Sequence, residues 1–247
     1  MKIVFTPDWF LGSDVLIDTF SFLILLTLFI FAYKSYKLSK NKNSFYLGMG
    51  FLLIAIGEIS TILTKLTLFY DTIFTQTVGQ MIITYNLVRS TEVLFYTGFF
   101  LHKLFTLLGL YTLYITVIKK RPNEFVLVLY FLLISSIFGS LFYYIFHLTT
   151  LIILLLIICA YYKIYKKNKL SGTRILISAF VLLALSHSIF LFSTLPLLYV
   201  AGQIMQMISY IIFLSLIMVI WKNGKKKKQN KHNIRYVGSY TGKRRKD

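Results

Sequence analysis

The sequence contains very little cysteine, proline and acid. Its single cysteine, Cys159, excludes an intrachain disulfide and any zinc site built from several cysteines. Its three prolines, Pro7, Pro122 and Pro196, all lie outside the apolar stretches of the chain. Only 14% of the residues are charged, whereas 57% are hydrophobic. Such a composition cannot cover the surface of a water-soluble protein of 247 residues, which indicates an integral membrane protein.

Apolar stretches long enough to cross the hydrocarbon core, about 20 residues each, recur along the chain. The shortest of them precedes Tyr162, and the turn before it, around His147, is the least defined boundary. The first fourteen residues lack the basic region and cleavage site of a signal peptide, so the first span is expected to remain in a multi-pass protein of the cell membrane. The sequence predicts an all-α fold of seven transmembrane helices, near residues 14–33, 45–66, 92–118, 125–144, 146–162, 174–194 and 197–221.

The positive charges predict an orientation. Lysine and arginine near helix ends are retained on the cytoplasmic side of a membrane. Of the 27 Lys and Arg residues, all but Lys2, Lys65, Arg89 and Lys103 fall at ends that seven spans place on one face. The N-terminus is therefore predicted outside and the C-terminus inside.

An internal repeat predicts how the spans are grouped. Residues 33–58 match residues 162–187 without a gap, and both segments begin with the motif Tyr-Lys-x-Tyr-Lys-x-x-Lys. The last matched pair, Glu58 and His187, is chemically unlike. A weaker match aligns Lys103 with Gln206 in the third span of each half. This pattern predicts a parallel 3+1+3 arrangement, because both copies enter the membrane from the same side. The halves are residues 14–118 and 146–221, joined by a linker helix at 125–144. Coincidence remains the alternative, since repeats are hard to detect in a biased composition.

The segment 67–91 is an insertion in the first half only, expected on the outer face. It mixes apolar and polar residues too closely for a span. It is interpreted as a long loop, with an interfacial amphipathic piece or an outward extension of the third span as alternatives.

Polar residues inside the predicted spans are the candidate site, because an ionisable group at the bilayer centre is costly unless it is paired or hydrated. At about 1.5 Å of rise per residue, Glu58, Lys103 and His187 lie at similar depths in the membrane. Glu58 is expected to pair with Lys103, and His187 is expected to lie near Gln206. The candidate binding or structural cluster is Glu58, His102, Lys103, His187, Gln203 and Gln206.

Two interpretations of this cluster remain open: a site for a substrate or proton, and a hydrogen-bonded clamp between helices. The small residues Gly48, Gly50, Gly57, Ala179 and Ala184 are expected to allow close packing of the second and sixth spans. No catalytic constellation indicates an enzyme, and the sequence predicts no cofactor. His102, His147 and His187 lie on different spans without a His-x-x-x-His pair, so no metal site is predicted either.

The basic tail, residues 222–247, holds eleven lysines and arginines against one acid and is expected to be disordered. Each basic residue near an anionic leaflet contributes about 1 kcal/mol, so the predicted partner is the anionic lipid surface of the bilayer. A cytoplasmic protein partner is the alternative, and nucleic acid is a weaker one, supported by Tyr236 and Tyr240 among the basic residues.

The seven spans and external N-terminus resemble the rhodopsin arrangement, and the 3+1+3 layout is similar to that of the sugar-transporting SWEET proteins. Residues 197–221 contain no lysine for a retinal Schiff base, and the repeat helices lack the prolines of SWEET proteins. The chain also resembles prokaryotic, including archaeal, seven-span proteins and the membrane sensor modules of signalling kinases. Two functions are therefore expected: a sensor, receptor-like or partner-binding module, or alternatively a small-molecule or proton-coupled transporter.

Overall fold

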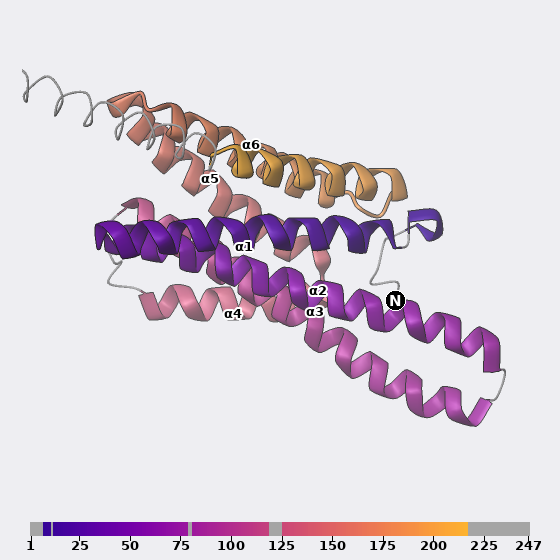
Figure 1. The fold of residues 1–247 in the computed structure, drawn as a ribbon. Coiled ribbons are helices and arrows are strands. Elements are labelled where there is room, and N and C mark those ends of the chain that lie inside the picture. Colours follow the sequence, from indigo (N-terminus) through magenta and orange to yellow (C-terminus); the bar gives the residue numbers. More distant parts are fainter. Residues whose placement is uncertain (1–6, 11, 79–80, 119–124, 217–247) are drawn as a thin grey trace, which may run out of the picture.

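Long helices make up the computed structural model, which describes residues 7–10, 12–78, 81–118 and 125–216 (Figure 1). Six of the helices in these ranges are long and apolar enough to cross a membrane, which indicates a membrane protein. A short 3-10 helix, Asp8–Phe10, comes first. It is followed by α1 (Ser13–Ser39), α2 (Lys42–Val78), α3 (Met81–Ile118), α4 (Phe125–Leu141), α5 (Tyr143–Asn168), α6 (Ser171–Phe190) and a last helix, Pro196–Leu216.

The seven predicted spans all correspond to helices, but two lengths differ from expectation. The stretch expected to be shortest, 146–162, belongs to α5, a helix of 26 residues. The predicted linker is instead the short one, because α4 has only 17 residues. The boundary between them lies at Phe142, so His147 is inside α5 and not in a turn.

The repeated segments have the same backbone geometry where their first helices end. Lys40 closes α1 in the left-handed conformation, and its N–H bonds to the carbonyl of Tyr36. The repeat-related Lys169 closes α5 in the same conformation, and its N–H bonds to the carbonyl of Tyr165. This arrangement satisfies a carbonyl that the end of a helix leaves open. The motif therefore encodes a helix end and a basic turn in both copies, while the larger 3+1+3 grouping stays a prediction.

The described residues of the insertion, 67–78 and 81–91, are helical and do not form a loop. Both α2 and α3 continue beyond their apolar portions, Lys42–Thr67 and Val93–Ile118. Figure 1 shows the two extensions projecting side by side from the bundle at the end where α1 begins. The structure thus shows a helical extension, of the second span as well as the third, while its outward direction stays a prediction.

Among the small residues of α2, Gly50 and Gly57 lie against α3, whereas Gly48 lies against α1. A Cβ atom added to Gly57 would lie 3.1 Å from the carbonyl oxygen of His102. One added to Gly109 would lie 2.7 Å from the carbonyl oxygen of Gly50. Close backbone approach of this kind replaces the hydrophobic effect as a source of helix association within a bilayer. Ala179, expected to allow close packing of the sixth span, is fully buried, and its backbone carbonyl accepts a 2.8 Å hydrogen bond from the Ser209 hydroxyl of the last helix.

Candidate functional site

A cavity of about 260 Å³ is lined by residues of α1 to α6 and of the last helix. Its wall is largely aromatic and aliphatic, with contributions such as Phe99, Leu110 and Phe146. The structure brings the whole candidate cluster to this wall: Glu58, His102, Lys103, His187, Gln203 and Gln206 all line the cavity. The shared depth estimated from the sequence thus corresponds to a shared location, because the helices that carry these residues face one another.

Glu58 does not pair with Lys103. Its Oε1 accepts hydrogen bonds from the hydroxyl of Tyr210 at 3.2 Å and from Nε2 of Gln206 at 3.4 Å. The Nζ of Lys103 donates to the carbonyl of Gly139 at 2.7 Å. Glu58 is therefore held by neutral donors on the last helix, and the predicted ion pair is wrong. His187 and Gln206, expected to lie near each other, form no hydrogen bond among the described residues. Gln206 bonds instead to Glu58 and Tyr210.

The histidines divide into one pair and one separate ring. Nδ1 of His147 lies 3.1 Å from Nδ1 of His187, so one ring donates and the other accepts. His102 uses its Nδ1 to donate to the carbonyl of Gly57 at 3.1 Å. Phe190 packs against the pair, with its ring centroid 5.1 Å from that of His147. His147 was missed as a site residue because the sequence placed it at a span boundary.

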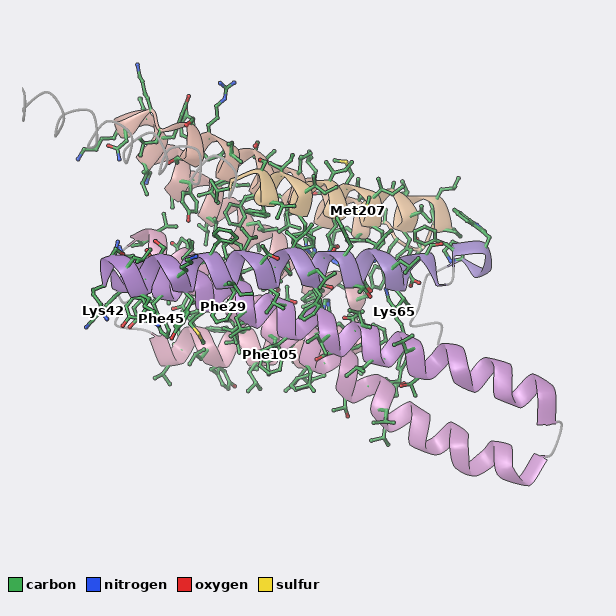
Figure 2. The ribbon with its side chains drawn as sticks, in the orientation of Figure 1. Phe29, Lys42, Phe45, Lys65, Phe105 and Met207 are labelled. Atoms are coloured by element: carbon green, nitrogen blue, oxygen red, sulfur yellow. The ribbon has the colours of Figure 1, made fainter. Side chains whose placement is uncertain are left out.

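A buried group of opposite charges lies at one side of the cavity and was also missed. Lys65 extends from α2 toward α1, where its Nζ lies 3.0 Å from Asp14 and 2.6 Å from Asp18 (Figure 2). All three side chains are buried, and both Lys65 and Asp18 line the cavity. The signal in the sequence is the spacing of Asp14 and Asp18, since residues four apart share one face of a helix.

Two buried polar atoms that belong to cavity-lining residues have no hydrogen-bond partner within the described parts of the chain. They are Oγ1 of Thr106 and Oε1 of Gln203. Each residue is only 7% exposed. Leaving such a group unsatisfied costs about 1–3 kcal/mol, so native structures supply a partner from protein, water or ligand. Both residues line the cavity, and Thr106 Oγ1 lies where α3 packs closely against Gly57 of α2.

The part of the chain that the structure describes contains no group of three or more His, Cys, Asp or Glu side chains that could hold a metal ion. Cys159 lies exposed on α5, away from the cavity lining.

Comparison of the chain with protein families, curated proteins and solved structures finds no match. We therefore infer its function from the chemistry of the cavity.

Proposed function

We propose that the protein is a ligand-binding membrane module, of the sensor or receptor-like type, that takes up a small molecule in the cavity. The observation that carries this proposal is the pair of unsatisfied atoms, Thr106 Oγ1 and Gln203 Oε1, on two residues that line the cavity from different helices. Ligand pockets combine mostly apolar walls with a few convergent polar groups, and this cavity has that composition.

A binding role fits the hydrogen bonds of the cavity better than catalysis. An activated nucleophile needs a base within hydrogen-bond reach of its hydroxyl or thiol. The histidine rings of the cavity instead bond to each other and to the carbonyl of Gly57. We accordingly assign the protein no reaction and no cofactor.

The predicted orientation assigns a different side of the membrane to each end of the helix bundle. With the basic helix ends in the cytoplasm, the α2–α3 hairpin projects outward and the tail meets anionic lipid or a protein partner inside. The tail, residues 222–247, lies outside the described residues, so its partners rest on its charge alone.

Transport is the second candidate, and the surroundings of Glu58 favour it. The hydrogen-bond donors to this carboxylate, Tyr210 and Gln206, are neutral, so gain or loss of a proton there breaks no ion pair. A proton-coupled transporter uses an intramembrane acid of this kind. Uptake of a bound compound into reconstituted vesicles that disappears in Glu58→Gln would assign transport, and binding without uptake would assign sensing.

Filling the cavity tests the proposed binding function. Leu183 is buried and lines the cavity, whereas Leu185, on the same helix, is 47% exposed. We expect Leu183→Trp to abolish ligand binding, because the indole occupies the space that the ligand needs, and Leu185→Trp to leave it unchanged. The measurement is thermal unfolding of the full chain in lipid nanodiscs, titrated with small aromatic anions, amides and amines.

A ligand that binds only the folded protein stabilises it by about 2.7 kcal/mol at 100 times its Kd. A saturable rise in unfolding temperature is therefore expected in the unsubstituted chain and in Leu185→Trp. Equal stabilisation of Leu183→Trp would place the binding site elsewhere and overturn the proposal.

A further inference from the structure

The charges that line the cavity differ in how the protein compensates them. Lys65 has two carboxylates, Asp14 and Asp18, within 3.0 Å. Glu58 accepts hydrogen bonds from the side chains of Tyr210 and Gln206. Both groups therefore receive side-chain partners, which are charged for Lys65 and neutral for Glu58.

Lys103 has no such partner. It is 8% exposed, and both ion pairs formed by the described residues belong to Lys65. An ammonium group carries three N–H donors. One N–H bonds to the carbonyl of Gly139 at 2.7 Å, and the described residues supply no second acceptor. A buried ammonium is costly unless an opposite charge or water compensates it. Lys103 is thus a buried cation of the cavity that no acidic side chain of the described residues compensates.

The residues beside Lys103 indicate the shape of the anion that would complete this site. Thr106 follows one turn later on α3, which places it on the same side of the helix. Its unpartnered hydroxyl can donate one hydrogen bond. One ammonium and one hydroxyl suit a group with two acceptor oxygens and a single negative charge. A carboxylate fits this description, whereas a phosphate dianion presents more charge and more oxygens than these donors serve.

The walls of the cavity indicate what the carboxylate is attached to. Phe99, Leu110, Phe146 and Phe190 line the same space as Lys103 and Thr106. This aromatic and aliphatic part of the wall favours an organic body, because it offers apolar contact area that a small inorganic ion would not use.

We infer that the ligand of this cavity is a small organic carboxylate, with its charge on Lys103 Nζ and Thr106 Oγ1 and its apolar body against the aromatic wall. This inference rests on the proposed binding function and names its ligand class. The hydrogen bonds to the carboxylate are charge-assisted, which makes them about twice as strong as bonds between neutral groups.

The test compares the full chain in nanodiscs with three matched probe series. The carboxylates are phenylacetate, phenylpropanoate and phenylbutanoate, and the other two series are their amides and the corresponding amines. We expect saturable binding of a carboxylate, with its amide and amine weaker by about tenfold or more. Lys103→Met should remove that difference between carboxylate and amide, while Lys103→Arg should largely retain it.

Two further variants separate the site from general effects of charge and folding. Lys166→Met removes one positive charge from an exposed position on α5 and should leave carboxylate affinity unchanged. Thr106→Val keeps the shape and the charge of the site, so it remains usable if Lys103→Met fails to fold. It should weaken carboxylate binding severalfold more than amide binding.

The outcomes distinguish this inference from the function on which it rests. If amides or amines bind as tightly as the carboxylates, the inference of a carboxylate ligand is overturned. If Leu183→Trp also abolishes that binding, the cavity is still the ligand site. Unchanged carboxylate affinity in both Lys103→Met and Thr106→Val would also overturn it. Absence of saturable binding in all three series would overturn both proposals.

Discussion

Lys65→Met is expected to lower the free energy of unfolding by about 3–5 kcal/mol, the usual effect of breaking a buried ion pair from one side. Lys65 holds Asp14 and Asp18 between α1 and α2, and its loss leaves two carboxylates close together in a buried place. Methionine keeps most of the length of the side chain, so the change removes charge more than volume.

A removal of all three charges makes this expectation specific. The triple variant Asp14→Asn, Asp18→Asn and Lys65→Met should recover most of the lost stability, because neither buried carboxylate then remains without its cation. Lys34→Met, at an exposed position on α1, is the matched control and should change little. The measurement is equilibrium unfolding in detergent. A loss below about 1 kcal/mol, typical of exposed pairs, would show that the three groups are hydrated and not buried.

Phe213→Ala is expected to have an effect of similar size, about 3–5 kcal/mol, because it opens a void in the packed core. Phe213 is 1% exposed, and its ring centroid lies 5.7 Å from that of Phe51 and 4.9 Å from that of Phe180. Phe51 and Phe180 are matched in the predicted repeat, and a single ring on the last helix contacts both of them. Within a bilayer the loss arises chiefly from van der Waals contacts.

The control for this prediction is Phe192→Ala, which removes the same side chain from a position that is 64% exposed. Thermal unfolding in one detergent should separate the two variants clearly. If Phe213→Ala and Phe192→Ala lower the stability equally, Phe213 does not lie in a tightly packed core. The contact of its ring with Phe51 and Phe180 would then contribute little to stability.

The sequence predicted features that depend on local properties of the chain. The helices follow from runs of apolar residues of spanning length, and the equivalent ends at Lys40 and Lys169 follow from a repeated motif. The common depth of Glu58, Lys103 and His187 follows from the fixed rise of a helix. All three residues line one cavity.

The sequence did not predict which of these polar groups bond to one another. Depth fixes a position along the membrane normal, but partners depend on helix rotation and on which helices are neighbours. Pairing Glu58 with Lys103 by charge alone overlooked Tyr210 and Gln206, which reach the carboxylate from the last helix. Long, flexible side chains add to the difficulty, because the Nζ of Lys103 extends to a carbonyl on α4.

The insertion and the acid pair were misjudged for related reasons. Mixed polar and apolar residues in 67–91 resemble a loop when only membrane spans are considered, yet a helix can continue beyond a bilayer on its own hydrogen bonds. Asp14 and Asp18 were not among the candidate site residues, although their spacing places them on one face of α1.

The central claim is that the cavity holds a ligand, and a density map of the full chain in lipid nanodiscs tests it most directly. The map would be determined with and without the tightest-binding phenyl carboxylate, amide or amine. We expect added density within hydrogen-bond distance of Thr106 Oγ1 or Gln203 Oε1, between α3 and the last helix. Helices closed over this space in both maps, with the two atoms bonded to other side chains of the protein, would contradict the account.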